Sequence, residues 1–309
     1  MSNDKLSVSL KLIVVTLVTC ATTLGITLVL GTTKLNSLLG IQPLKTEKEK
    51  ASQDQETIGS AQAVFSTANQ INQVPKKFQG TVVYQGKLKP TDKVIALTFD
   101  DGPSPKNTAQ ILEILQKNNI KGTFFMIGQM VKYFPQVAKQ VAADGEVIGN
   151  HTWHHSYRHM DIVTAASEIN TTADIIYQTT GVKTTLFRPP GGFLNNGLAD
   201  YAKSQKYTVI MWSELSGDAE RPSPQVPNMV RNVLKNAKPG AIVLMHDGGG
   251  NRSRTVQALP EIINGLKAQG YKFVTIPELL EIQAQEKNLV TPVSPVVTNH
   301  EYPNNQLHH

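Results

Sequence analysis

The sequence predicts an α/β domain in which about seven parallel strands alternate with helices and form a barrel, preceded by a membrane-spanning helix. Three observations support this prediction. Short apolar runs alternate with segments of helical periodicity between residues 79 and 286. Polar residues of catalytic type follow the ends of these runs. A charge-free apolar segment covers residues 12–30.

The candidate strands are seven short runs of apolar, mostly β-branched or aromatic residues. They cover residues 94–99, 122–127, 146–149, 185–187, 207–212, 241–245 and 272–276. Helical patterns fill the gaps between them, for example at residues 109–117, 131–143, 163–179 and 256–268. This alternation is typical of a parallel sheet whose faces are covered by helices. Seven such units in one domain favour a barrel over an open sheet.

The N-terminal apolar segment, residues 12–30, determines where the domain is expected to reside. At about 1.5 Å per residue it spans roughly 28 Å, close to the hydrocarbon core of a bilayer. Lys5 and Lys11 precede it, which favours an N-terminus inside the cytoplasm. The alternative is a cleaved signal peptide, but the segment is long for one and no clean cleavage site follows. In both cases the domain is exported, either membrane-anchored or secreted.

Composition divides the chain into four parts and excludes some functions. We expect residues 1–31 to form a cytoplasmic tip and anchor, 32–78 a polar spacer, 79–286 the globular α/β domain and 287–309 a disordered tail. The net charge of +6 comes without Lys and Arg runs interleaved with aromatics, so we expect no nucleic-acid partner. Nothing in the sequence predicts a protein partner. The single cysteine excludes a disulfide framework and a cysteine-based zinc site.

Chemically versatile residues follow five of the predicted strands. In a parallel barrel the carboxyl ends of the strands share one face, where the loops build the active site. We therefore expect five segments to converge on one pocket. They are Asp100-Asp101, Asn150-His151, Arg188, Asp218 and His246-Asp247.

The pair His151 and His155 is the first candidate for metal binding. The two residues are four apart, so one helical turn would place both rings on the same side. Two imidazoles with one carboxylate are a recurrent Zn²⁺ ligand set that leaves positions open for water. Asp100 and Asp101 repel each other unless a cation lies nearby. On an extended strand they point in opposite directions, so one can bind metal while the other faces substrate. His154 and His159 lie nearby and are alternative candidates for the ligand role, although exposed polar residues are the ordinary interpretation of both. The ordinary interpretation of Asp100–Pro103 is a plain turn.

Arg188, Gly191 and His246 are the remaining residues of catalytic type. Arg188 can clamp a carboxylate through two hydrogen bonds, although alone it is equally compatible with a solvated surface turn. Gly191 permits close approach of the backbone to a ligand. His246 titrates near neutral pH, which suits acid catalysis, although an isolated histidine is more often structural.

Taken together, these motifs resemble those of the NodB-homology polysaccharide deacetylases, carbohydrate esterase family 4, in order and spacing. The resemblance covers about residues 90–280 and implies a distorted, TIM-like (β/α) barrel. It also implies a divalent metal, usually Zn²⁺ with Co²⁺, Mn²⁺ or Ni²⁺ as alternatives. The implied reaction removes acetyl groups from N- or O-acetylated sugars, with peptidoglycan or a chitin-like glycan as the expected substrate. The matching motifs are TFDDGP (98–103), HTWHH (151–155), RPPG (188–191) and LMH (244–246).

The resemblance assigns the central roles residue by residue. Asp101, His151 and His155 match the metal ligands. Asp100 matches the catalytic base that takes a proton from the attacking water. His246 matches the catalytic acid that protonates the leaving amine.

Supporting roles follow from the same resemblance. Arg188 matches the residue that orients the base, and Asp218 the one that tunes the acid. A backbone N–H near Gly191 would hold the oxyanion, and Leu244 would lie beside the substrate.

The chain departs from the family pattern at three positions. Leu215 stands where the family has an Asp, Ala219 where it has a Trp, and Gly191 where an aromatic residue is common. The missing Trp normally forms an apolar wall near the acetyl methyl, so we expect Trp212 or Leu244 to supply it. Metal ligands and proton-transfer residues are intact, and the departures fall where substrate choice is set.

Two other functions are compatible with this fold. A non-catalytic glycan-binding protein on the same barrel would have lost a catalytic residue, and none is lost here. An amide hydrolase of small non-sugar substrates typically has an altered first motif, whereas Asp100–Pro103 is intact. An open groove would favour a polymer, and a closed pocket a small ligand.

Overall fold

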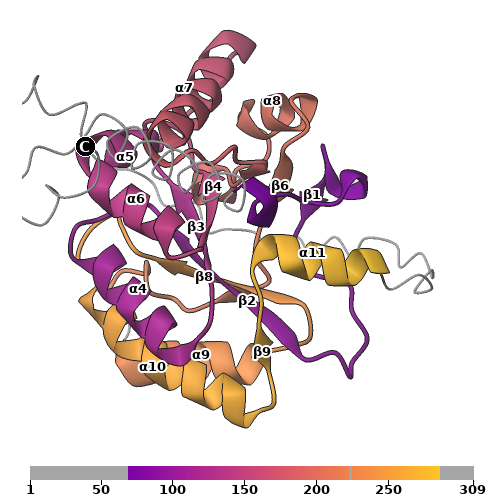
Figure 1. Ribbon diagram of the computed structural model, residues 1–309, viewed down its shortest axis with the longest axis vertical. Coiled ribbons are helices and arrows are strands. Elements are labelled where there is room, and N and C mark those ends of the chain that lie inside the picture. The colour runs from indigo at the N-terminus through magenta and orange to yellow at the C-terminus, as the bar shows by residue number, and fades with distance from the viewer. Residues whose placement is uncertain (1–68, 223–224, 286–309) are drawn as a thin grey trace, which may run out of the picture. The chain divides into compact units, whose positions relative to one another are not determined.

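The computed structural model describes residues 69–222 and 225–285 (Figure 1). The predictions for the membrane segment at 12–30, for the spacer as far as residue 68 and for the tail at 287–309 lie outside these residues. Within the described part of the chain, we find no helix with the length and apolarity needed to span a membrane.

The described residues contain one nine-stranded sheet in which all paired strands are parallel. Its order is β1-β6-β5-β4-β3-β2-β8-β7, and β9 also pairs with β2. All seven predicted runs contain a strand, which confirms the α/β class. The strands are β1 (Val82–Val83), β2 (Val94–Asp100), β3 (Thr123–Met126), β4 (Val147–Asn150), β5 (Leu186–Phe187), β6 (Thr208–Ile210), β7 (Glu214–Leu215), β8 (Ala241–His246) and β9 (Lys272–Phe273).

The sheet curls into a half-barrel, so the curled parallel sheet of the predicted distorted barrel is confirmed, while the barrel itself remains open. The two strands at the ends of the order, β1 and β7, do not pair with each other. Each is only two residues long, so neither has many backbone groups for hydrogen bonds to a further strand. After Val83 the chain crosses instead to the loop before β8, where Gly86 N–H donates to the Gly240 carbonyl at 2.8 Å.

The helices lie between successive strands and cover the sheet in two groups (Figure 1). In one group, α10 packs against both α4 and α9; in the other, α5, α6 and α7 pack together. The predicted helix at 131–143 is two helices, because Pro135 has no N–H to donate and starts a new one. The helices are η1 (Lys76–Phe78), α4 (Asn107–Asn118), α5 (Gly128–Tyr133), α6 (Pro135–Ala143), α7 (Ile162–Thr180), η2 (Pro190–Gly192), α8 (Leu198–Ser204), α9 (Val226–Asn236), α10 (Ser253–Ala268) and α11 (Ile276–Gln285).

Strand β2 shows how the core positions the site. Its odd residues Ile95, Leu97 and Phe99 belong to the apolar cluster under the helices. Ala96 belongs to a second cluster with residues such as Phe125, Leu186 and Ile242. Since side chains alternate along a strand, Asp100 shares the face of Ala96. The last residue of β2 is therefore a carboxylate on the concave side of the sheet.

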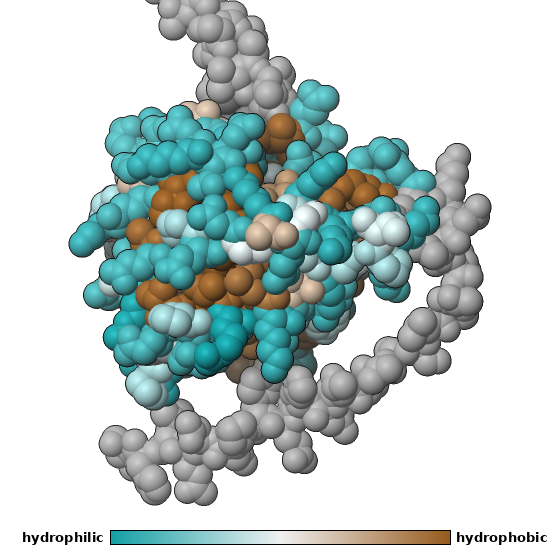
Figure 2. Space-filling model, turned by 90° about the horizontal axis from the view of Figure 1, so that it is seen from below, coloured by the Kyte–Doolittle hydropathy of each residue, from teal (hydrophilic) through white to brown (hydrophobic). Residues whose placement is uncertain are grey.

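The surface agrees with this arrangement. The face seen in Figure 2 is mainly hydrophilic, with apolar side chains in the furrows between rows of polar ones. That pattern is typical of amphipathic helices packed on a sheet. The described residues before position 79 also contribute to the fold, because Val74 and Phe78 are buried in the core.

Candidate active site

A cavity of about 520 Å³ lies at the carboxyl ends of the strands. Arg188 and Asp218 lie buried behind its wall and hydrogen-bond to lining residues. The structure thus brings the five predicted segments together. The predicted site residues that line the cavity are Asp100, Asp101, His151, His155, Gly191, Leu244 and His246.

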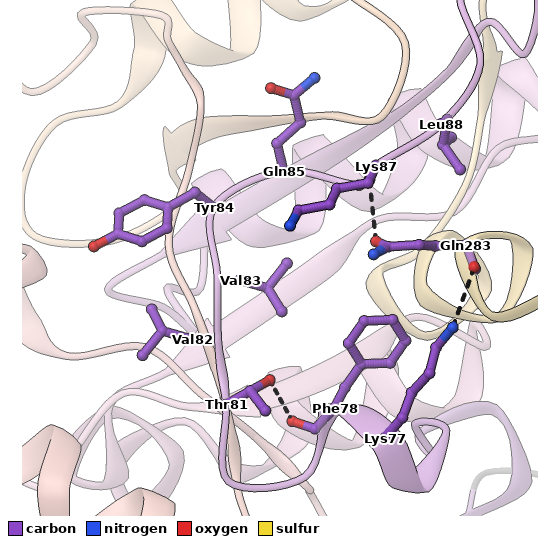
Figure 3. A pocket seen from close by; sticks show the side chains of 11 residues that line it. Lys77, Phe78, Thr81, Val82, Val83, Tyr84, Gln85, Lys87, Leu88 and Gln283 are labelled. Carbon is purple, nitrogen blue, oxygen red and sulfur yellow. Dashed lines mark hydrogen bonds between the residues drawn. The ribbon is translucent and has the colours of Figure 1, made fainter. Parts of the chain in front are cut away.

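Another cavity, of about 560 Å³, lies between residues 77–88 and α11 (Figure 3). Lys77 Nζ donates to the Gln283 carbonyl across it, and Lys87 N–H donates to Gln283 Oε1. Among the described residues, no His, Asp, Glu or Cys lines it, so it lacks the side chains that usually bind a catalytic metal. The candidate active site is therefore the cavity at the strand ends.

Asp101, His151 and His155 form a candidate metal site. One donor atom from each lies within 4.8 Å of the other two. Asp101 Oδ1 is 3.0 Å from His155 Nε2 and 3.5 Å from His151 Nε2. Ligand atoms on a tetrahedral Zn²⁺, each about 2.1 Å from the ion, are about 3.4 Å apart, which these distances match. Asp101 Oδ1 is buried without a hydrogen-bond partner among the described residues, as expected of an atom that binds a cation.

The charge state of Asp101 also fits a metal ligand. Burial raises the pKa of Asp101, but the neighbouring rings of His151 and His155 lower it by more, so the pKa falls below its ordinary value. Asp101 is thus an ionised carboxylate, which is the form that binds metal.

The two histidines are brought together by a loop, and the predicted helical turn is wrong. Residues 151–155 follow β4 without helical structure, and their rings are 4.9 Å apart. Thr152 and His155 have φ values of 66° and 56°, in the left-handed region that residues other than glycine rarely adopt. Thr152 Oγ1 accepts from His155 N–H at 3.1 Å, and Asn150 Oδ1 accepts from Thr152 N–H at 3.0 Å. Side-chain hydrogen bonds therefore stabilise the unusual backbone that aims both rings.

His151 is fixed in the tautomer that a metal ligand needs. Its Nδ1 lies 2.7 Å from the Arg188 carbonyl, which can only accept, so Nδ1 carries the proton. Nε2 is then left with a lone pair directed at Asp101.

Glu168 of α7 holds the metal-binding loop, and the sequence analysis missed it. Its carboxylate accepts from the N–H groups of Trp153 and His154, both at 2.9 Å, and contacts His154 Nδ1 at 2.5 Å. Its position could have indicated this role, because Glu168 lies on the buried face of α7 with Ala165 and Ile169. An acidic residue on the apolar face of a helix needs partners, and here these are the loop amides.

Arg188 is fully buried, not a solvated surface residue. Its Nη1 donates to Asp100 Oδ1 at 2.7 Å and to Thr98 Oγ1 at 2.8 Å. Nε and Nη2 donate to the carbonyls of Ile210 and Met211, each at 3.0 Å. The guanidinium also lies 4.1 Å from the centre of the Phe125 ring. Burial lowers the pKa of Arg188, while the charge of Asp100 opposes that shift.

Asp100 and Asp101 face the same cavity, contrary to the expectation that they point apart. Strand β2 ends at Asp100, and Asp101 has a φ of 74°, so strand alternation stops between them. Asp100 Oδ2 and Asp101 Oδ1 lie 3.7 and 3.5 Å from the same atom, His151 Nε2. One carboxylate can therefore bind an ion while its neighbour accepts a proton beside it.

His246 faces Asp218 as part of a second pair. His246 Nδ1 is 2.8 Å from Asp218 Oδ1, and Asp218 Oδ2 accepts from His246 N–H and Thr255 Oγ1. Burial lowers the pKa of His246, but the hydrogen bond and charge of Asp218 raise it more, to above its ordinary value. The pKa of Asp218 is lowered, because its bonds to His246 outweigh its burial. The pair thus favours the protonated form of the His246 imidazole at the cavity.

Two further residues lie near the site: Arg252, which was not identified from the sequence, and Asp247, which was noted only for its position after a strand. Arg252 donates to the carbonyls of Gly248 and Asp218, and its Nη2 lies 3.9 Å from Asp101 Oδ2. Asp247 is buried behind Gly102, where a Cβ would come within 2.0 Å of its Oδ2. Burial raises the pKa of Asp247 to about 7. Gly102 is therefore required in the Asp-Asp-Gly-Pro motif for space.

The three departures from the family pattern meet in the cavity wall. Gly191, Leu215 and Ala219 all line the cavity, and so do Trp212 and Leu244. Both residues expected to supply the apolar wall are therefore within reach of a bound ligand.

One cavity thus brings together a carboxylate held by a buried cation, a candidate metal-ligand triad and an imidazole held by a carboxylate, which is the arrangement expected of a hydrolase that uses a metal. Comparison with known proteins also indicates a hydrolase. The family model "Polysaccharide deacetylase" matches residues 87–210. A peptidoglycan-N-acetylglucosamine deacetylase from Bacillus cereus is 40% identical over 210 residues, 66% of this chain and 96% of that protein.

Two other relatives are a second deacetylase and a pseudoenzyme. The peptidoglycan-N-acetylmuramic acid deacetylase PdaC of Bacillus subtilis is 36% identical over 217 residues, 70% of this chain and 44% of that protein. The crystal structure of a CE4 family pseudoenzyme from Bacillus anthracis is 31% identical with a TM-score of 0.59, covering 65% of this chain and 69% of that one. The chain belongs to the polysaccharide deacetylase family, carbohydrate esterase family 4.

Proposed function

We propose that the protein is a metal-dependent deacetylase that removes N-acetyl groups from N-acetylglucosamine units of peptidoglycan or a chitin-like glycan. One observation carries the proposal: Asp100 with Arg188 and His246 with Asp218 are both intact around the metal-ligand triad. The names of two relatives, each a peptidoglycan deacetylase, support the substrate class.

The metal that the site would hold is Zn²⁺, with Co²⁺, Mn²⁺ or Ni²⁺ as alternatives. Two imidazoles and one carboxylate suit these ions, and the uncommitted Asp101 Oδ1 supports a cation there. When bound, such an ion lowers the pKa of water toward about 7 and polarises a carbonyl oxygen.

The chain's own residues would move the protons. Asp100 Oδ2, with Oδ1 held by Arg188, accepts the proton of the attacking water. A backbone N–H near Gly191 donates to the developing oxyanion, and the side chain of Leu244 packs near the acetyl methyl. His246, kept protonated by Asp218, donates a proton to the leaving nitrogen as the C–N bond breaks. The products are acetate and a free amine.

The shape of the cavity favours a polymer over a small amide. Tyr157 and Leu215 line it and are 57% and 51% exposed, so the cavity opens to solvent. A long glycan can lie across such an opening, whereas a small substrate is usually enclosed.

We further propose that residues 12–30 remain as an anchor that holds the domain outside the cytoplasm. The charge-free segment supports this, as does the location of peptidoglycan, outside the cytoplasmic membrane. Membranes washed with carbonate should retain the full-length protein. Release of a shortened chain into the medium would instead show that residues 12–30 belong to a cleaved signal peptide.

Acetate release from acetylated glycans tests the function. We expect the full-length protein to release acetate from N-acetylglucosamine polymers or peptidoglycan. This activity should stop when the metal is removed by a chelator and return when Zn²⁺ is added back. The D100N variant should bind the same glycans without turnover. Wild-type binding without acetate release from any acetylated glycan would instead assign a non-catalytic role, as in the pseudoenzyme relative.

A further inference from the structure

Exposed aromatic side chains gather beside the metal-ligand triad. Tyr157 is 57% exposed and lines the cavity, and Phe193 is 46% exposed next to it. The ring centres of Tyr157 and Phe193 are 5.7 Å apart, with planes inclined by 66°. The Tyr157 ring also lies 5.2 Å from the His155 ring, inclined by 73°. The three rings thus follow one another beside the cavity, from the candidate metal ligand His155 through Tyr157 to Phe193.

Such a cluster is unfavourable in water unless something covers it. Aromatic rings that remain exposed side by side lose the burial that normally stabilises them, and clusters of this kind mark ligand-binding grooves. Neither ring has a charged side chain stacked on it among the described residues.

Gly191 explains how the two rings reach this position. A Cβ on Gly191 would lie 2.9 Å from Phe193 Cε2 and 3.0 Å from Tyr157 Cε1. Its φ of 62° also disfavours any side chain. The space that a side chain at position 191 would need is therefore taken by rings from residues 157 and 193.

We propose that Tyr157 and Phe193 form a sugar-binding subsite, called here the aromatic platform, next to the acetyl-binding cavity. A pyranose ring has an apolar C–H face that packs on an aromatic ring, and its hydroxyls remain in water. The platform would bind the sugar adjacent to the one that is deacetylated. It therefore selects glycan chains over single sugars. This inference rests on the proposed function for its choice of ligand.

Kinetics on N-acetylglucosamine oligomers of increasing length test the platform. In the wild type, KM should fall as the oligomer extends beyond one sugar. In Y157A and F193A this gain should be lost, with KM for the longer oligomers raised by about tenfold and kcat nearly unchanged. Y157F, which keeps the ring, should behave like the wild type. Equal KM values for wild type, Y157A and F193A on long oligomers would overturn the proposal.

Two controls separate stacking from other effects. Tyr133 on α5 is 61% exposed and does not line the cavity, so Y133A should leave the length dependence of KM unchanged. Tyr157 contacts His155, so Zn²⁺ binding to Y157A is measured by calorimetry and should match that of the wild type. If Y157A bound Zn²⁺ more weakly and lost the same fraction of its kcat/KM on short and long oligomers, Tyr157 would act through the metal site instead.

A binding measurement keeps this inference distinct from the proposed function. Oligomer binding to D100N and to the D100N/Y157A double variant is measured by calorimetry without turnover. Weaker binding by the double variant supports the platform even if the wild type releases no acetate. Identical binding overturns it even if the wild type is fully active.

Discussion

The two residues that we propose for proton transfer, Asp100 and His246, are held by partners of opposite kind. Asp100 is a carboxylate held by a cation, Arg188, whereas His246 is an imidazole held by a carboxylate, Asp218. Arg188 is inaccessible to solvent and donates to four different acceptors, while the His246 side chain is 14% exposed. Each pair thus joins a residue that lines the cavity to a partner buried behind it, but the base half, Asp100 with Arg188, is more deeply buried than the acid half, His246 with Asp218. Damage to the first should cost stability, and damage to the second mainly activity.

The largest effect is expected from R188M, which breaks the base half. It leaves Asp100 buried without its cation, so the free energy of unfolding should fall by about 3–5 kcal/mol. Urea denaturation followed by circular dichroism measures this. R221M changes an exposed arginine that lines the same cavity, and it should stay within about 0.5 kcal/mol of the wild type. Similar stabilities for the two variants would contradict a structural role for Arg188.

H246Q breaks the acid half and should act on the rate. We expect kcat to fall by about 10²–10⁴-fold, the usual contribution of a positioned acid. Unfolding free energy should change far less than in R188M, because His246 is partly exposed. Acetate-release kinetics and denaturation of the same preparation measure both quantities. A stability loss as large as that of R188M would remove the distinction between the two halves.

The metal ligands lie between the halves, and Glu168 tests how they are positioned. E168A removes the carboxylate that holds the loop amides of Trp153 and His154. Zn²⁺ affinity should fall by about 10–100-fold, the range for residues that orient metal ligands. Calorimetry on metal-free protein measures this. E113A, on an exposed part of α4, is the matched control, and equal Zn²⁺ affinity in both variants would rule out this role for Glu168.

The smallest and most specific change is expected from D218N. Asp218 raises the pKa of His246, so protonated His246 persists to higher pH than it would alone. Activity that needs this proton is full at low pH and is lost as pH rises through the raised pKa. Without the charge of Asp218 that pKa falls, and the alkaline limb of the kcat profile should move to lower pH. An alkaline limb at the wild-type position would show that another group controls it.

The sequence predicted the parts of the site that depend on strand ends. Asp100, His151 and His246 were placed together because strand ends converge in a parallel sheet, which needs no side-chain detail. The conformation of residues 151–155 was not predictable in this way. Left-handed φ values at Thr152 and His155 depend on hydrogen bonds within the folded loop, and spacing alone suggested a helical turn.

Long-range contacts explain the other misses. Glu168 lies in a helix, and its role depends on how that helix meets the loop after β4. Strands β1 and β7 are two residues each, too short for any periodic signal. Closure of the barrel depended on these two strands, so the half-barrel could not be foreseen from the longer runs.

Zn²⁺ titration of metal-free protein, with acetate release from a glycan followed at each step, tests the central claim most directly. We predict that activity rises in proportion to bound Zn²⁺ and levels off at one ion per chain, and that D101N loses both binding and activity. Full acetate release by the metal-free protein, or unchanged Zn²⁺ binding by D101N, would contradict the assignment of Asp101, His151 and His155 as the metal site.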